Sequence, residues 1–322
     1  MIARRGVLGA MLAASVAGTG NAQDKYPSKP IRLVIPFPPG GGADAVARPL
    51  GPLMTETLGQ PILLDNRGGA NGNLGAEIVA KAPPDGYTLL LANSSLTISA
   101  GLYAKLPFNP LADFSPISLI GATPSLLATH PSVPARTVKE FVELAKARPG
   151  KLSYGSSGIG STMHLGAALL QSMAGLDMVH VPYKGGGPAI ADALSGQTDF
   201  VFTNPVGVLS QVKAGKLNAL AVTSKKRLAI LPDVPTFEES GYPGLLSSTM
   251  YGLLGPAGLP RDVVMKLNAA VVTAVARKEL AGHLIELGYE MESNTPEQFA
   301  VFLRDDAAQW VRLIKLTGAS AD

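Results

Sequence analysis

The stretch Pro36-Phe37-Pro38-Pro39-Gly40-Gly41-Gly42-Ala43-Asp44 lies between two segments of different periodicity. The apolar run at residues 31–35 before it predicts a strand, and residues 46–58 after it predict a helix. Glycines let a backbone approach a ligand closely, and the first N–H groups of a helix have no partner inside that helix. This order of strand, glycine-rich turn and helix start predicts a seat for a carboxylate with no catalytic side chain beside it.

The composition describes a folded protein of about two domains. The chain has 322 residues, of which 46% are hydrophobic and 16% are charged. Without Arg4 and Arg5, the 27 basic residues fall to 25 against 24 acidic residues, so the net charge is about +1. This balance does not indicate nucleic-acid binding. The chain has no cysteine, which excludes disulfides, thiolate metal sites and a lipid-anchored cysteine.

The first 22 residues predict a cleaved export signal. Arg4 and Arg5 precede an apolar run at residues 6–18, which is too short to span a bilayer. Small residues ending at Ala22 are suited to cleavage before Gln23. Ordinary secretion fits better than twin-arginine export, although the arginine pair leaves the second route open. We therefore expect a periplasmic protein.

After the signal, short apolar runs alternate with amphipathic helical stretches. This alternation predicts an α/β fold with largely parallel strands. Predicted helices include residues 138–147, 163–173 and 188–194. The predicted strands cover residues 31–36, 62–65, 87–92, 152–154, 178–181, 199–202 and 217–222.

Two segments have the pattern of a chain that crosses between domains. Short apolar runs at residues 117–120 and 125–128 are separated by Gly121 and Pro124, and a second crossing is predicted at residues 249–254. We therefore expect one domain made of residues 23–121 and 251–322, and another made of residues 122–250.

The C-terminal part predicts a long helix that packs against a domain. Thr295-Pro296-Glu297-Gln298 supplies an N-cap, a first-turn proline and a capping-box glutamine in order. One face of this helix then carries recurring large apolar residues, namely Phe299, Phe302, Leu303, Trp310 and Leu313.

Five loops rich in Gly, Ser and Asn lie close to the ends of predicted strands, and they cover residues 37–44, 66–72, 93–95, 154–162 and 182–187. In open α/β sheets, ligands bind outside the carboxyl ends of the strands. Small residues there offer amide and hydroxyl donors without bulk, which favours recognition of a small acid in a cleft. Within these loops, Arg67 is expected to brace its loop and Lys184 to be solvated.

Enzymatic and cofactor motifs fit less well. The stretches at residues 70–75 and 158–163 each lack one glycine of the dinucleotide fingerprint GxGxxG. Residues 155–159 miss the GxSxG nucleophile elbow by one position. His130, His164, His180 and His283 are scattered, so no metal site is expected. His180 is expected in the core, and His164 is expected either to line the site or to pack at a helix start. The alternative function is a secreted serine-dependent hydrolase that uses Ser157 or Ser161 with His164.

Seven stretches give the sequence a close resemblance to the Bug family, the TctC-like solute-binding proteins of tripartite tricarboxylate transporters. The resemblance extends over the whole chain after the export signal. These stretches are YPSKPI (26–31), PFPPGGGAD (36–44), APPDGYTLL (82–90), PGKLSYGSSG (149–158), HVPYKG (180–185), LPDVPT (231–236) and TPEQF (295–299).

The resemblance implies a two-domain periplasmic binding protein of type II, the Venus-flytrap fold, with a central cleft. It implies capture of a small organic acid and delivery to a membrane permease. The loops at residues 37–42 and 156–162 would grip a carboxylate from opposite sides. The sequence departs from the family at Thr203-Asn204, where an Asp-Asn pair is common, and this leaves the identity of the ligand open.

The expected protein is a carboxylate-binding monomer with no catalytic residue, metal or cofactor. A role in sensing in place of transport also remains open. The candidate ligand-binding residues are Phe37, Gly41, Gly42, Asp44, Asn93, Ser94, Ser156, Gly160, Ser161, Thr162, Tyr183, Thr203 and Asn204.

Overall fold

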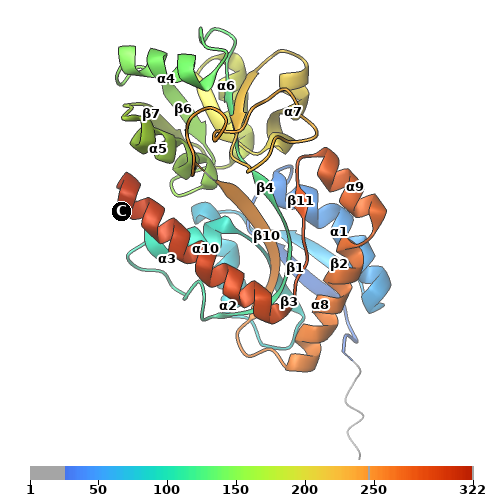
Figure 1. The fold of residues 1–322 in the computed structure, drawn as a ribbon. Coiled ribbons are helices and arrows are strands. Elements are labelled where there is room, and N and C mark those ends of the chain that lie inside the picture. The colour runs from blue at the N-terminus through green and yellow to red at the C-terminus, as the bar shows by residue number, and fades with distance from the viewer. Residues whose placement is uncertain (1–25, 246, 321–322) are drawn as a thin grey trace, which may run out of the picture.

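The computed structural model describes residues 26–245 and 247–320, which form two lobes stacked one above the other (Figure 1). Each lobe is built on one β-sheet, and the predicted export signal lies outside the described residues. No helix among the described residues has both the length and the apolar character that a membrane span requires.

The sheet of the first lobe has six strands in the order β11-β4-β10-β3-β1-β2. Strands β1 to β3 are parallel, whereas β10 runs antiparallel to both β3 and β4. The bounds are β1 Ile31–Ile35, β2 Ile62–Asn66, β3 Thr88–Asn93, β4 Phe114–Pro124, β10 Ser248–Pro256 and β11 Glu290–Met291.

The sheet of the second lobe has five strands in the order β7-β6-β8-β5-β9. Strands β6, β7 and β8 are parallel, and β5 is antiparallel to β8 and β9. The parallel arrangement predicted from the sequence therefore holds for the strands that lead into the glycine-rich loops, and the strands β5, β10 and β11 break it. The bounds are β5 Leu126–Thr129, β6 Ser153–Ser156, β7 Val179–Pro182, β8 Phe200–Thr203 and β9 Asn218–Val222.

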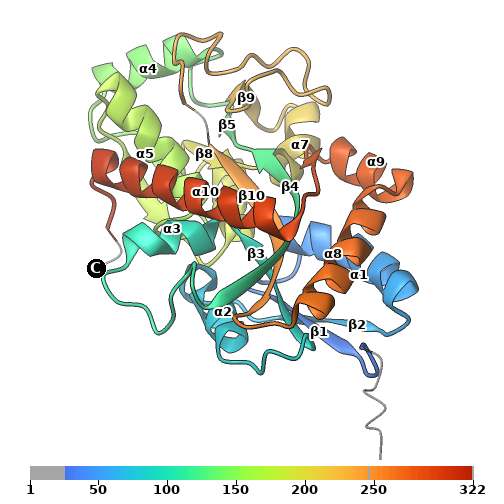
Figure 2. The ribbon, with the colours of Figure 1, turned by 60° about the horizontal axis from the view of Figure 1, so that its bottom comes forward.

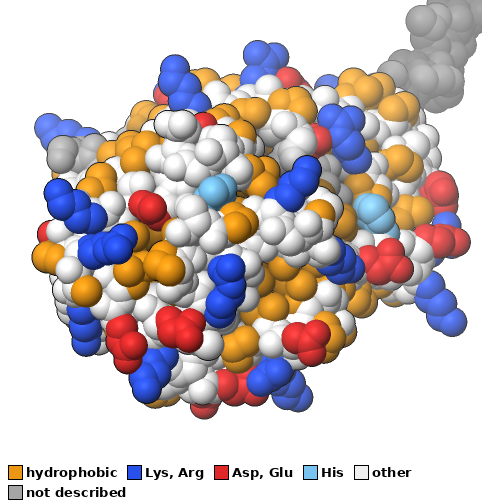
Figure 3. All heavy atoms as spheres, turned by 90° about the horizontal axis from the view of Figure 1, so that it is seen from above, with side chains coloured by type: hydrophobic (Ala, Val, Ile, Leu, Met, Phe, Trp, Pro, Cys, Tyr) orange, Lys and Arg blue, Asp and Glu red, His pale blue; other side chains and the backbone are white. Residues whose placement is uncertain are grey.

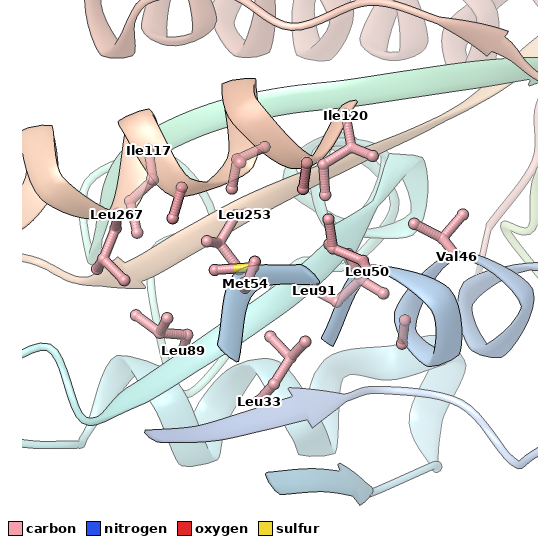
Figure 4. Packing of buried hydrophobic residues seen from close by; sticks show 14 of the residues in the cluster. Leu33, Val46, Leu50, Met54, Leu89, Leu91, Ile117, Ile120, Leu253 and Leu267 are labelled. Carbon is pink, nitrogen blue, oxygen red and sulfur yellow. The ribbon is translucent and has the colours of Figure 1, made fainter. Parts of the chain in front are cut away.

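Helices cover both faces of each sheet. In the first lobe, α1 and α8 pack on one face around Leu33, Leu50 and Leu267 (Figure 4), while α2, α3 and α10 cover the other. In the second lobe, α4 and α5 lie on one face and α6 and α7 on the other. The helices are α1 Gly42–Leu58, α2 Asn73–Ala80, α3 Ser94–Leu102, α4 Val138–Ala147, α5 Thr162–Ala174, α6 Gly186–Ser195, α7 Pro205–Lys213, α8 Arg261–Val275, α9 Lys278–Glu286 and α10 Pro296–Thr317, with the short 3-10 helix η1 at Ala70–Gly72.

The chain passes between the lobes along β4 and β10. Strand β4 extends to Pro124 and β5 of the other sheet begins at Leu126, so the chain leaves the first sheet inside the segment predicted for the first crossing. Gly121 lies within β4 and serves a close approach, since a Cβ there would lie 2.6 Å from the carbonyl oxygen of Glu290 on β11. Ser125 follows β4, and its amide donates to the Ser247 carbonyl oxygen at 3.0 Å just before β10 begins.

Helix α10 contacts both lobes (Figures 1 and 2). Its predicted capping box between Thr295 and Gln298 is confirmed. Phe299 packs in the first lobe, whereas Trp310 joins the second-lobe cluster that includes Leu165 of α5. The apolar face of one helix therefore belongs to both hydrophobic cores.

We expect replacement of Trp310 by alanine to lower the free energy of unfolding by about 3–5 kcal/mol, the usual loss for a buried aromatic side chain. Trp310 is 1% exposed, and Leu316 on the same helix is 62% exposed. Leu316→Ala is therefore the control, with an expected change within about 0.5 kcal/mol. Urea unfolding followed by circular dichroism measures both; equal losses would show that α10 does not join the two cores.

Candidate functional site

The glycine-rich turn before α1 presents unpaired backbone donors. Gly41 is the N-cap, and no side chain caps the helix. The first intrahelical bond runs from the Ala45 amide to the Gly41 carbonyl oxygen at 3.0 Å, so the amides of residues 42–44 precede it and have no partner within the helix. Residues 38–41 are exposed. The turn therefore has the geometry and the positive helix end that bind an anion.

Asp44 braces this turn from behind. The carboxylate is 4% exposed, and Oδ2 accepts from the Gly40 amide at 3.0 Å and from Arg48 Nε at 2.6 Å. Asn66 Nδ2 donates to the Phe37 carbonyl oxygen at 2.9 Å and to Asp44 Oδ1 at 3.4 Å. Burial acts to raise the pKa of Asp44, but these hydrogen bonds and the Arg48 charge outweigh it and hold the pKa below its ordinary value. The carboxylate that was predicted to contact a ligand is thus bonded within the turn.

Two buried tyrosines that no sequence motif marks, Tyr251 and Tyr289, hold Gly42 in place. Tyr289 Oη donates to the Gly42 carbonyl oxygen at 2.9 Å, and the rings of Tyr251 and Tyr289 lie 5.5 Å apart. A Cβ on Gly42 would lie 2.3 Å from Tyr251 Oη, so only glycine fits there. Burial raises the pKa of both tyrosines, which keeps their hydroxyls protonated as donors.

The start of α5 forms a second set of donors. Ser161 is the N-cap, and its Oγ accepts from the His164 amide at 3.2 Å and donates to the Gly158 carbonyl oxygen at 2.7 Å. The first intrahelical bond joins the Leu165 amide to the Ser161 carbonyl oxygen, so the Thr162 and Met163 amides have no partner within the helix. The Ser161 hydroxyl thus has both of its partners within the turn, and its contact with a ligand stays a prediction.

A pair of histidines lies against the loop before α5. His164 Nδ1 accepts from the Gly160 amide at 3.1 Å, and His180 Nε2 is 2.6 Å from Ser156 Oγ. The two rings stack with centroids 4.0 Å apart. Burial lowers the pKa of both to about 4, helped for His164 by the neighbouring His180. His180 was expected in the core; it is half-buried and bonded to a predicted ligand residue.

The predicted residues at the end of β3 serve the local structure. Asn93 Oδ1 caps α3 by accepting from the Ser95 amide at 3.0 Å. Ser94 Oγ accepts from the Met250 amide at 2.9 Å, which ties α3 to β10. Ser95 Oγ donates to Asn71 Oδ1 at 3.2 Å, beside a small cavity of about 10 Å³. The second predicted loop is thereby joined to the third.

The remaining predicted residues lie in two parts of the second lobe, Tyr183 before α6 and the pair Thr203 and Asn204 at the end of β8. Tyr183 Oη donates to Asp192 Oδ2 at 2.5 Å, so its hydroxyl is directed to α6. Burial and the Asp192 carboxylate raise the pKa of Tyr183 to about 12. Thr203 is buried at the end of β8, and Asn204 Nδ2 donates to Thr249 Oγ1 at 3.3 Å on the crossing strand β10.

Arg67 and Lys184 lie as the sequence predicted. Arg67 Nε donates to Asp65 Oδ1 at 2.9 Å and so braces its loop, and Lys184 is exposed. On the face seen in Figure 3, basic and acidic side chains are interspersed, which agrees with the small net charge.

Strand β10 brings the two helix starts together. Thr249 Oγ1 lies 2.7 Å from Thr162 Oγ1 of α5, and Tyr251 lies against Gly42 of α1. Because residues two apart on a strand point to the same face and lie about 7 Å apart, Thr249 and Tyr251 hold both helix starts on one side of β10. Two mixed α/β lobes, joined by crossing strands with two helix starts beside them, define the class of periplasmic binding proteins.

The chain belongs to the family described as tripartite tricarboxylate transporter family receptor, which matches residues 46–319. Protein BugT of Bordetella pertussis (strain Tohama I) is 34% identical over 315 residues, with 97% of each chain covered. The resemblance to the Bug and TctC-like proteins is therefore confirmed.

Solved structures agree with this assignment. The periplasmic binding protein BugD is 35% identical with a TM-score of 0.86, covering 92% of this chain and 99% of that chain. The R. palustris protein Rpa4515, solved with adipate, is 32% identical with a TM-score of 0.88 and the same coverage. MatC from Rhodopseudomonas palustris, solved with bound malate, is 32% identical with a TM-score of 0.85, covering 90% of this chain and 100% of that chain.

The histidine pair predicts a loss of stability in acid. In the folded protein both pKa values lie at about 4, below the ordinary value of 6.5, so the unfolded chain binds more protons between these values. The free energy of unfolding is therefore not reduced by these histidines above pH 6.5, and it falls as the pH decreases from 6.5 toward 4. Urea unfolding at pH 7 and pH 4.5 measures the loss. A double variant with His164→Asn and His180→Gln cannot gain these protons and should lose less stability; an identical loss would contradict the prediction.

Proposed function

We propose that this protein is an exported receptor that captures a small organic acid between its two lobes and delivers it to a membrane permease. The observation that carries the proposal is the placement of the α1 and α5 starts on the same face of β10, through Tyr251 and Thr249. Helix starts attract anions because their free amides and the helix dipole both favour negative charge. A carboxylate has two oxygens and so can accept from both helix starts at once.

We propose a dicarboxylate of four to six carbons as the ligand class. The relatives solved with malate and adipate support this range, because both of those ligands carry two carboxylates. The donors of the site also favour an acid over an amine. The buried carboxylate of Asp44 beside the turn already accepts from Gly40, Arg48 and Asn66, so it has little capacity left for an ammonium group.

We place the hinge near Ser125 and Ser247, a few residues from the domain boundaries after residues 121 and 250 that the sequence predicted. Here β4 ends at Pro124 and β10 begins at Ser248. Ligand bonds to both helix starts would favour a closed arrangement, because an open one offers only half of those bonds. The loaded receptor is then the form that a permease recognises, with the protein in the periplasm as a monomer.

The hydrogen bonds of the Ser161 and Ser156 hydroxyls fit a binding role better than a hydrolytic one. Ser161 Oγ is engaged with the Gly158 carbonyl and the His164 amide, and His164 Nδ1 accepts from Gly160, so neither forms a nucleophile–base pair with the other. Ser156 does contact His180, but its side chain is fully buried. Turnover of a model ester that is abolished by Ser161→Ala would overturn this conclusion.

Replacement of Gly41 by valine should weaken ligand binding at least tenfold without unfolding the protein. The residue has φ −91°, and the nearest atom to an added Cβ is the Pro38 carbonyl oxygen at 3.9 Å, so the side chain fits the fold while it obstructs the exposed turn. A thermal-shift screen of mono-, di- and tricarboxylates, followed by calorimetric titration of adipate and malate, measures the effect.

Gly282→Val on α9 is the matched control, because an added Cβ there meets no atom within 4 Å and lies in a helix that carries no part of the site. This variant should bind like the unmodified protein. Unchanged affinity in Gly41→Val, or the absence of a thermal shift with every acid in the screen, would refute the proposed site.

A further inference from the structure

We propose that His164 and His180 are positioning residues that fix the loop of residues 156–162, and thereby the α5 amides that receive the ligand acid. The inference rests on the proposed function and assigns to this site two residues that are not among the candidate ligand-binding residues. Neither histidine is required to touch the ligand. Each acts through a bond to the loop, His164 at Gly160 and His180 at Ser156.

The bond between His164 and Gly160 fixes the C-terminal end of the loop. The Gly160 amide donates to His164 Nδ1 at 3.1 Å, so Nδ1 carries no proton and the ring of the neutral histidine is protonated at Nε2. Because His164 lies in the first turn of α5, this bond folds the end of the loop back onto the helix start. It fixes the direction in which the loop enters α5, next to the open amides of Thr162 and Met163.

At the other end of the loop, His180 bonds to Ser156. Ser156 Oγ lies 2.6 Å from His180 Nε2 and also accepts from the Gly158 amide at 3.2 Å. Ser156 thus transmits the position of His180 to Gly158. The Gly158 carbonyl oxygen in turn accepts from Ser161 Oγ at 2.7 Å, which completes a chain of bonds from β7 to the N-cap of α5.

The rings of His164 and His180 are anchored in the core by stacking. His164 stacks on His180 at 4.0 Å, His180 stacks on Tyr154 at 5.0 Å, and Tyr154 stacks on Phe200 at 5.2 Å. This row of rings extends from α5 across β7 and β6 to β8. Phe200 is fully buried and Tyr154 is 1% exposed, so the outer rings rest on a rigid base.

The groups that face the histidines leave them neutral at pH 7. The titratable groups in contact are the other histidine and Tyr154, whose pKa burial raises, and Phe200 behind them has no charge. Within residues 26–245 and 247–320, neither histidine forms an ion pair with a carboxylate. His164 Nδ1 therefore stays available as an acceptor. Because the loop is already held in its binding conformation, less of the binding free energy is lost in ordering it.

The test compares two substitutions at one position. Asparagine places Oδ1 close to the position of the histidine Nδ1 and can accept from Gly160, whereas leucine fills the space without an acceptor. We expect His164→Asn to bind adipate or malate within about threefold of the unmodified protein, and His164→Leu to bind at least tenfold more weakly by calorimetric titration. His283→Leu, at an exposed position on α9, is the control.

The amide signal of Gly160 provides a readout that does not depend on the ligand. In the ligand-free protein, nuclear magnetic resonance should show a hydrogen-bonded, slowly exchanging Gly160 amide and an His164 ring protonated at Nε2. The amide protection should persist in His164→Asn and disappear in His164→Leu. A role in stability alone predicts affinity losses that follow the melting temperature in both variants, with no rescue by asparagine.

The outcomes separate this inference from the proposed function. If the unmodified protein binds no acid, the proposed function fails while the Gly160 amide still decides the positioning role. If acids bind and His164→Leu binds them as tightly as the unmodified protein does, the positioning role is refuted and the proposed function stands. An unprotected Gly160 amide in the unmodified protein would also overturn the positioning role.

Discussion

The alternation of side chains along β10 is the constraint on which the site depends. Thr249 and Tyr251 lie two residues apart and so point to the same face of the strand. Thr249 contacts Thr162 and Asn204 from the second lobe, whereas Tyr251 lies against Gly42 in the first. A shift of one residue in the register of β10 would turn both side chains to the other face and separate the two helix starts. The register with β3 and β4 therefore sets the geometry of the site.

Helix α10 adds a second connection between the lobes, at a distance from the crossing strands. Trp310 and Leu313 pack with the second lobe while Phe299 and Leu303 pack with the first. Exposing a side chain of this kind costs about 1.5–3 kcal/mol. Movement of one lobe relative to the other is thus least costly when it preserves the α10 contacts and bends the chain near Ser125 and Ser247.

The seven strands predicted from the sequence lie within one or two residues of observed strands, because apolar runs and the turns that end them are local features. Strands β4, β5, β10 and β11 were not predicted as strands; β4 and β10 lie where the sequence predicted the crossings. It also predicted the N-terminal capping box of α10, since this motif lies within four residues. The bond from Tyr289 to Gly42 joins residues 247 positions apart, and the bond from His180 to Ser156 depends on the pairing of β6 with β7. No motif in the sequence marks Tyr289, so such contacts become evident only when the fold is known.

The same distinction explains why several predicted ligand residues have internal partners. Asn93 and Ser94 are polar residues near a strand end and Tyr183 is an aromatic residue in a glycine-rich loop, and each of these side chains bonds to a neighbouring segment. Their bonds shape the turns, and the amides at the helix starts remain as donors. Backbone donors recognise an acid group without distinguishing what is attached to it. Selection among organic acids must then come from the space around the ligand chain, whereas affinity for the acid comes from how rigidly the turns are held.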